Sequence, residues 1–180
     1  MFFVVGLCAS CLGTTVKPDR CGWVQPLSKA SVLPLVAQVA LGKRERLVIL
    51  GNDYPTLDGT GIRDFIHVVD VASGHLSALN HLNDSGVMTV NLGTGTGTSV
   101  LQIVQTFESV SGSPVPHTIG ERRIGDVAAC YADPTLAADL LEWKSTKSLT
   151  QMCADHWRWQ LNNPNGYHQP HPSDEPDAPA

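Results

Sequence analysis

The sequence predicts a protein of the α/β class, in which short strands alternate with amphipathic helices. Residues 87–92 form a β-prone run, and the glycine-rich segment 93–98 leads from this run into a stretch whose apolar residues recur at helical spacing. In addition, 42% of the 180 residues are hydrophobic, which is enough for one compact domain with a core. Strand, glycine turn and helix together form one α/β unit.

The first elements are predicted between residues 31 and 61. Ser31 can cap a helix over residues 32–41, which carries apolar residues at helical spacing and ends at Gly42. Residues 47–50 form a short β-prone run. The segment 52–61 is rich in glycine, proline and aspartate, and it is therefore predicted to be a loop.

Residues 65–69 read as a strand or extended segment, and Asp70 after them can cap a second helix. The apolar residues of this helix share one face: Ala72, Leu76, Leu79 and Leu82.

Two further helices are predicted towards the end of the sequence. Asp133 precedes Pro134 at the start of one helix, and residues 148–151 form a capping box at the start of the other. The stretch 162–180 contains five of the twelve prolines and little apolar content. It is predicted to be a disordered tail.

Charge and cysteine content exclude several classes of function. The net charge is −5 and no basic block is present, so a role in binding nucleic acid is not expected. The apolar start at residues 1–10 is too short to span a bilayer, and no membrane association is predicted. The cysteines have no disulfide-like layout, which indicates a reducing, cytoplasmic compartment: Cys8, Cys11, Cys21, Cys130 and Cys153.

The segment Gly93-x-Gly95-x-Gly97 resembles part of a dinucleotide-binding turn, because glycines there let a backbone approach a pyrophosphate at a helix N-terminus. However, the third position of that fingerprint is occupied by Thr98, and no acidic residue follows a second strand at the required distance. A structural turn is therefore the favoured interpretation. No tyrosine of the sequence is followed four positions later by a lysine, and no metal-binding histidine motif occurs.

Two arginine-bearing segments are the remaining candidates for a functional site. Arg63 lies in the segment 59–64, and Arg123 lies in the segment 121–126 with Asp126. The planar arginine fork matches phosphate oxygens, and a nearby carboxylate can accept ribose hydroxyls, so the segments suit a nucleoside diphosphate. Taken alone, each segment would be read as a solvated ion pair.

The run GNDYPTLDGTGIRDFIHVVD at residues 51–70 resembles UDP-glucose 4-epimerases, which are members of the extended short-chain dehydrogenase/reductase superfamily. The similarity extends over about residues 31–167. The other segments that carry it are Val90–Gly95, Arg122–Asp126, Tyr131–Pro134 and His156–Gln160.

This resemblance implies the C-terminal part of a Rossmann-like NAD(P)-binding fold with a small substrate-binding α/β domain. It divides the chain into an unrelated leader over residues 1–28, expected to be poorly ordered, the epimerase-like portion over residues 29–161, and the tail 162–180.

The resemblance also implies roles for individual residues around a bound UDP-hexose. Arg63 and Arg123 would bind the diphosphate, and Asp126 would bind the ribose. The strand 47–50 would flank the uracil through the backbone of Val48, Ile49 and Leu50. Two positions depart from the family: Ser31 replaces an asparagine expected near the phosphates, and Cys130 replaces a tyrosine.

The activity implied by the family is the interconversion of UDP-glucose and UDP-galactose in galactose metabolism. There, bound NAD takes a hydride from the sugar while a tyrosine, assisted by a lysine, takes the hydroxyl proton. The residues that bind NAD, the catalytic tyrosine and lysine, and the helices that form the family's homodimer are not found in this chain. It is therefore expected to be inactive alone. The alternatives are a non-catalytic UDP-sugar-binding module and a fragment of a related sugar-nucleotide dehydratase or decarboxylase.

Overall fold

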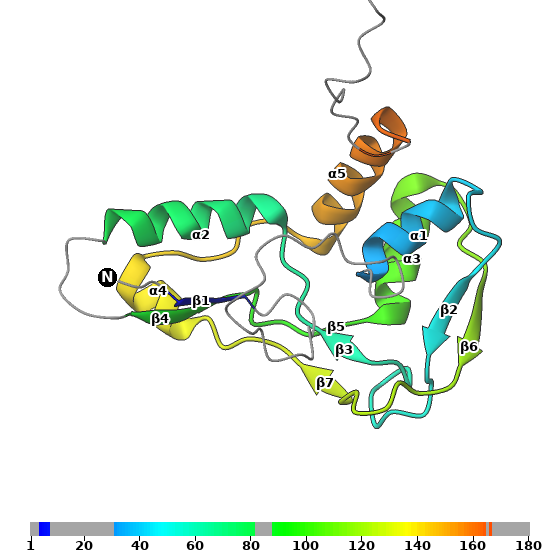
Figure 1. Ribbon diagram of the computed structural model, residues 1–180, viewed down its shortest axis with the longest axis horizontal. Coiled ribbons are helices and arrows are strands. Elements are labelled where there is room, and N and C mark those ends of the chain that lie inside the picture. Colours follow the sequence, from blue (N-terminus) through cyan, green and yellow to red (C-terminus); the bar gives the residue numbers. More distant parts are fainter. Residues whose placement is uncertain (1–3, 8–30, 82–87, 165, 167–180) are drawn as a thin grey trace, which may run out of the picture.

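The computed structural model describes residues 4–7, 31–81, 88–164 and 166. The secondary-structure elements form two groups, each with its own core, and a sheet of very short strands lies between them (Figure 1). Helices combine with parallel strand pairs, which confirms the predicted α/β class.

The larger group contains three helices and one pair of parallel strands. The helices are α1 (Val32–Ala40), α3 (Val100–Ser111) and α5 (Leu149–Asn162), and the strands are β2 (Leu47–Leu50) and β6 (His117–Gly120). Apolar side chains from α1, β2, α3 and α5 form one buried cluster, which includes Val36, Ile49, Ile103, Phe107 and Cys153. The predicted helix 32–41 and strand 47–50 are thereby confirmed, whereas β6 was not predicted.

The smaller group contains the helices α2 (Val68–Asn80) and α4 (Thr135–Leu141) and the parallel strands β1 (Val4–Leu7) and β4 (Thr89–Leu92). Its buried cluster consists of Ala78, Val90, Leu92, Ala137, Leu141 and Trp143. The pairing of β1 with β4 places a strand inside the segment 1–28, where no strand was predicted.

Three strands of two residues each connect the two groups. β3 (Ile62–Arg63) lies between β5 (Thr98–Ser99), to which it runs antiparallel, and β7 (Ala129–Cys130), to which it runs parallel. Strands this short carry too few residues for a periodic signal, and none of them was predicted. The central strand β3 carries Arg63, so this sheet positions one of the predicted site residues.

The capping box predicted at Ser148 is confirmed, and a second capping box, which was not predicted, lies at Ser99. Ser99 and Ser148 each accept a hydrogen bond from the backbone N–H three residues later, at distances of 3.1 and 3.2 Å. In return, the glutamine side chain at that position, Gln102 or Gln151, accepts from the serine backbone. Each reciprocal pair satisfies two donors that a helix N-terminus otherwise leaves unpaired.

The predicted start of α2 is wrong, because the cap is His67 rather than Asp70. The backbone N–H of Val69 donates to His67 Nδ1 at 3.0 Å. Asp70 instead lies buried inside the first turn, where its carboxylate accepts from the backbone N–H groups of Thr146 and Lys147 at 3.0 and 2.9 Å. The helix therefore begins at Val68, within the segment 65–69 that was predicted as extended.

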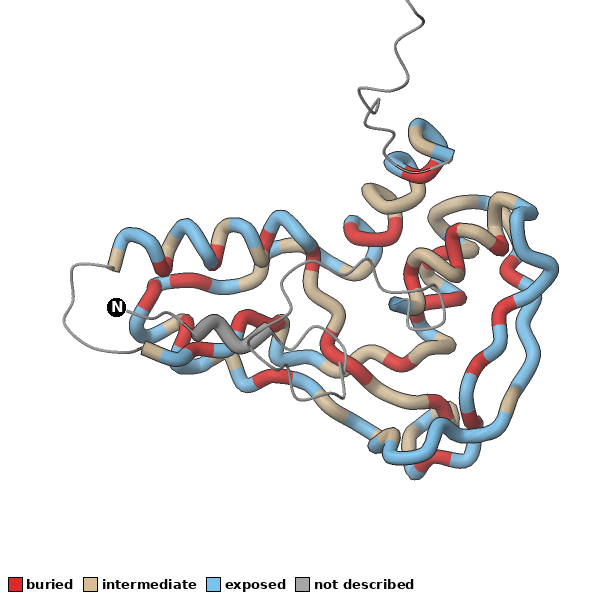
Figure 2. The backbone as a smooth tube through the Cα atoms, viewed as in Figure 1, coloured by how far each residue is buried: buried red, intermediate tan, exposed pale blue. Residues whose placement is uncertain are grey.

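The large apolar residues of α2 do not form its buried face. Leu76 and Leu79 are 62% and 55% exposed, and the opposite face with Gly74 and Ala78 is buried (Figure 2). A Cβ atom on Gly74 would lie 2.6 Å from a methyl carbon of Leu92, so the helix approaches β4 closely through its small residues.

The predicted boundaries at residues 28 and 162 remain predictions, because most of the leader and the tail lies outside the described residues. Cys8, Cys11, Cys21 and Leu82 also lie outside the described residues. Within the described ranges, no helix combines the length and hydropathy that crossing a bilayer requires. In those ranges, histidine, cysteine, aspartate and glutamate side chains also form no cluster suited to a metal ion.

Burial of His156 predicts a pH dependence of stability. Desolvation lowers the pKa of His156 below its ordinary value of 6.5, and the ring stacks on Trp159 while its Nε2 atom is buried without a partner among the described residues. The folded chain binds a proton at His156 less readily than the unfolded chain does. The contribution of neutral His156 to the free energy of unfolding is therefore complete above pH 6.5, and it is lost as the pH falls through the lowered pKa of the folded state.

We expect the urea midpoint, followed by circular dichroism, to fall between about pH 7 and pH 5, and to fall less in His156→Phe. The phenylalanine ring preserves the stacking but does not titrate. Equal pH slopes in the two proteins would show that another group controls this transition.

Candidate functional site

Arg63 and Asp126 meet although 63 residues separate them in the sequence. Arg63 ends the central strand β3, and Asp126 ends the loop that follows β6. The guanidinium forms an ion pair with the Asp126 carboxylate and also donates to the carbonyl oxygen of Ile62 at 2.7 Å. Arg63 is only 8% exposed. The structure thus brings together two residues from the two segments singled out in the sequence.

Arg123 lies in the same loop but faces solvent. The loop closes as a turn in which the Asp126 backbone N–H donates to the Arg123 carbonyl oxygen at 3.1 Å, and Gly125 adopts a φ of +82° that favours glycine. Within the described part of the chain, the Arg123 side chain makes no hydrogen bond or ion pair, and the residue is exposed. It is thus a cation available to an anionic ligand.

The strand β2 presents an apolar ledge to solvent. Val48 and Leu50 are 54% and 46% exposed, whereas Ile49 between them is 2% exposed and points into the core. Opposite Leu50 in the parallel pair lies Gly120, where a Cβ atom would come within 2.8 Å of Val48. Because Gly120 has no side chain, it does not crowd Val48. An exposed apolar surface of this kind suits the face of a planar base.

Ser31 lies elsewhere on the surface. It precedes α1, its side chain makes no capping hydrogen bond, and it borders a groove of about 730 Å³ between α1, α5 and the start of α2. His67 and Trp159 line the same groove, and Arg63, Arg123 and Asp126 do not. The structure therefore does not group Ser31 with the two arginine segments.

The glycine turn 93–97 is occupied by a side chain of the protein itself. The buried carboxylate of Asp64 accepts from the backbone N–H groups of Thr94 and Gly95 at 3.1 and 3.2 Å, and from that of Ala132 at 3.2 Å. The Thr94 hydroxyl adds a fourth donor at 2.6 Å. These N–H groups are the ones that a pyrophosphate would need, so the favoured interpretation as a structural turn is supported.

Asp58 anchors the loop that leads into β3. Its carboxylate accepts from the backbone N–H and hydroxyl of Thr60 at 2.9 and 2.8 Å, and from the Ser99 hydroxyl at the start of α3. Burial alone would raise the pKa of Asp58, but the hydrogen bonds from Ser99 and Thr60 outweigh it and hold the pKa below its ordinary value. The loop is thereby tied to the larger core, which steadies the strand that carries Arg63.

Three residues next to the site were missed by the sequence reasoning: Asp53, Tyr54 and Arg122. Arg122 Nε donates to Asp53 Oδ1 at 2.6 Å, and its guanidinium carbon lies 4.0 Å from the centroid of the Tyr54 ring. All three lie in segments that carry the resemblance to the family. However, Asp53 and Arg122 are 69 positions apart, and no local pattern shows that they touch.

A family model described as GDP-mannose 4,6 dehydratase matches residues 22–156. The chain belongs to this family. Over 138 residues it is 56% identical to UDP-glucose 4-epimerase of Bacillus subtilis and 54% identical to that of Homo sapiens, in each case covering 76% of this chain. The predicted resemblance to UDP-glucose 4-epimerases is thereby confirmed.

A solved structure of a family member supports the fold. The UDP-glucose 4-epimerase of Bifidobacterium longum, in complex with NAD+ and UDP, superposes with a TM-score of 0.74 at 46% identity, covering 76% of this chain and 41% of that one. The matched regions of the Bacillus subtilis and human relatives likewise amount to 41% and 40% of their length. The chain thus spans about two fifths of the length of these family members.

Proposed function

We propose that this chain binds the UDP moiety of a UDP-hexose, as the substrate-binding portion of a UDP-glucose 4-epimerase. The observation that carries the proposal is the convergence of Arg63 and Asp126, from two segments far apart in sequence, beside the solvent-facing Arg123. Two guanidinium groups with one carboxylate suit a nucleoside diphosphate, because guanidinium binds phosphate and carboxylate accepts hydroxyl groups. The named relatives and the UDP complex support the choice of nucleotide.

Each part of the nucleotide has a proposed contact. Arg63 and Arg123 hold the diphosphate, Asp126 accepts from the ribose hydroxyls, and the β2 ledge around Val48 and Leu50 lies against the uracil. Since Arg63 is paired with Asp126 in the free chain, binding exchanges that ion pair for contacts with phosphate and ribose. A charged partner replaces a charged partner, so the buried guanidinium is not left unpaired.

NAD does not fit the glycine turn of this chain, because the N–H groups of Thr94 and Gly95 already donate to Asp64. In addition, no tyrosine of the sequence has a lysine four positions later. We therefore propose that hydride transfer requires residues not present in this chain, and that the chain alone does not epimerise UDP-glucose. Formation of UDP-galactose by the purified chain with added NAD, followed by chromatography, would refute this part of the proposal.

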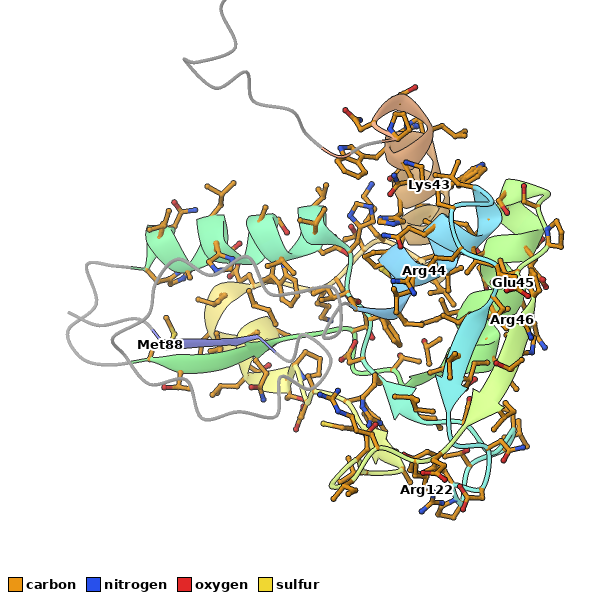
Figure 3. The ribbon with its side chains drawn as sticks, turned by 45° about the vertical axis from the view of Figure 1, so that its right-hand side comes forward. Lys43, Arg44, Glu45, Arg46, Met88 and Arg122 are labelled. Carbon is orange, nitrogen blue, oxygen red and sulfur yellow. The ribbon has the colours of Figure 1, made fainter. Side chains whose placement is uncertain are left out.

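The proposal is tested first by calorimetric titration of the full chain with UDP, and the informative variant is Arg123→Met. We expect the affinity to fall about tenfold, because one charge-assisted hydrogen bond to phosphate contributes about 1.5–3 kcal/mol. Arg123 is exposed and makes no internal hydrogen bond among the described residues, so the fold should not change. The matched control is Arg46→Met, which removes the same charge at the opposite end of β2 (Figure 3).

The alternative of a related dehydratase that uses another nucleotide is tested by the same titration with GDP. The proposed function predicts tighter binding of UDP than of GDP, because UDP is the nucleotide named for the relatives and for the solved complex. Equal affinities for UDP and GDP would favour the alternative. UDP binding without any epimerisation in the presence of NAD would equally fit a non-catalytic binding module.

A further inference from the structure

Arg122 connects two loops that meet at one end of the molecule. Its Nε atom donates to Asp53 Oδ1 at 2.6 Å, and a terminal N–H group donates to the carbonyl oxygen of Asp53. The guanidinium also lies over the ring of Tyr54, 4.0 Å from the centroid. Figure 3 shows Arg122 at the lower tip of the molecule, beside the loop that follows β2. One side chain therefore makes three different contacts with two consecutive residues.

The packing around these contacts is close. Tyr54 is 5% exposed and so provides a buried platform. Gly51 adopts a φ of +86°, and a Cβ atom there would lie 2.7 Å from Arg122 Cγ, so the arginine stem passes directly over the end of β2. The backbone N–H of Gly51 donates to the Gly120 carbonyl oxygen at 3.0 Å and continues the β2 and β6 ladder to this point.

An exposed ion pair by itself contributes little to stability, and the Arg122 side chain is 41% exposed. The combination is different, because a guanidinium that binds a carboxylate and a carbonyl while stacking on a buried ring has one preferred geometry. Arg122 thereby fixes the backbone immediately before Arg123. It also fixes the start of the turn that ends at Asp126.

We propose that Arg122 is a positioning residue for the nucleotide: it locks the 121–126 loop to the Asp53 and Tyr54 loop, so that Arg123 and Asp126 are held ready for the diphosphate and ribose. This inference rests on the proposed function. The guanidinium of Arg122 is engaged with Asp53 and Tyr54, and it contributes affinity only by reducing the ordering that binding would otherwise require.

The test is UDP titration of the full chain carrying Arg122→Met, Asp53→Ala, or both. We expect each single change to reduce the affinity roughly tenfold, and the double change to reduce it no further, because the two residues act as one contact. Additive losses would overturn the proposal, since they would mean that Arg122 binds the ligand independently of Asp53. An unchanged affinity in Arg122→Met would overturn it as well.

A conservative variant separates positioning from simple charge. Arg122→Lys keeps the positive charge but loses the planar fork and the stacking, so we expect it to bind UDP as weakly as Arg122→Met. Affinity restored by lysine would overturn the positioning role. Thermal midpoints measured by circular dichroism should stay close to that of the native chain in all variants, and Tyr54→Phe serves as a folding control that keeps the ring.

Hydrogen exchange of the free chain distinguishes this inference from the proposed function. We expect faster exchange in the 121–126 segment of Arg122→Met than in the native chain, without any nucleotide present. Unchanged exchange would overturn the inference even if UDP binds. Failure of the native chain to bind UDP would instead overturn the proposed function and, with it, the role of Arg122 in nucleotide binding.

Discussion

Replacing Asp64 with alanine is expected to lower the free energy of unfolding by about 4 kcal/mol, which is a large part of the stability of a typical domain. Asp64 is 1% exposed, and its carboxylate is the acceptor for backbone N–H groups of Thr94, Gly95 and Ala132. Alanine would leave these donors without a partner, and each unsatisfied buried donor costs about 1–3 kcal/mol. Urea unfolding followed by circular dichroism measures the change.

Two further variants make this result interpretable. Asp64→Asn retains one acceptor oxygen but turns an N–H₂ group towards donors, so it should fall between the native chain and Asp64→Ala. Asp139→Ala removes a carboxylate from an exposed position of α4 and should leave the urea midpoint unchanged. If Asp64→Ala has the same urea midpoint as the native chain, the carboxylate does not organise the glycine turn.

Replacing Arg63 with methionine is expected to weaken UDP binding about a hundredfold, equivalent to about 2.7 kcal/mol. Arg63 is the more buried of the two proposed phosphate-binding arginines, and a guanidinium in a partly desolvated position binds an anion more strongly than one in water. The loss should therefore exceed that of Arg123→Met. Calorimetric titration with UDP measures both.

The same change also removes the partner of Asp126, which is 29% exposed in its side chain. Because that carboxylate remains partly hydrated, we expect a stability loss of about 2 kcal/mol rather than the larger cost of a fully buried unpaired charge. Affinity is accordingly measured at low temperature, after circular dichroism has shown the variant to be folded. A folded Arg63→Met that binds UDP as tightly as the native chain would remove Arg63 from the proposed site.

Elements with strong local signals were predicted correctly from the sequence. The helix that begins after Ser31, the strand 47–50 and the capping box at Ser148 all depend on residues within four positions of one another. The local pattern failed at the start of α2, where His67 rather than Asp70 caps the helix. Asp70 instead accepts from the backbone N–H groups of Thr146 and Lys147, and a contact between segments so far apart leaves no periodic signal.

The residues of the candidate site also differ in whether the sequence predicted them. Arg63, Arg123 and Asp126 were identified from the chemistry of their segments and from the resemblance to a family, and the structure adds that Arg63 and Asp126 form an ion pair. By contrast, the roles of Asp64 and Arg122 depend on contacts with residues far along the chain, and neither was predicted.

The sequence by itself determined which chemical groups this protein can bring to a nucleotide, because residue type and spacing along one segment set charge, donor geometry and local secondary structure. Only the tertiary structure decided how these groups are used. It paired Arg63 with Asp126, filled the glycine turn with the Asp64 carboxylate, and tied Arg122 to the opposite loop. The physical reason is that such contacts satisfy buried polar groups across long sequence separations, and their partners are set by packing rather than by neighbouring residues.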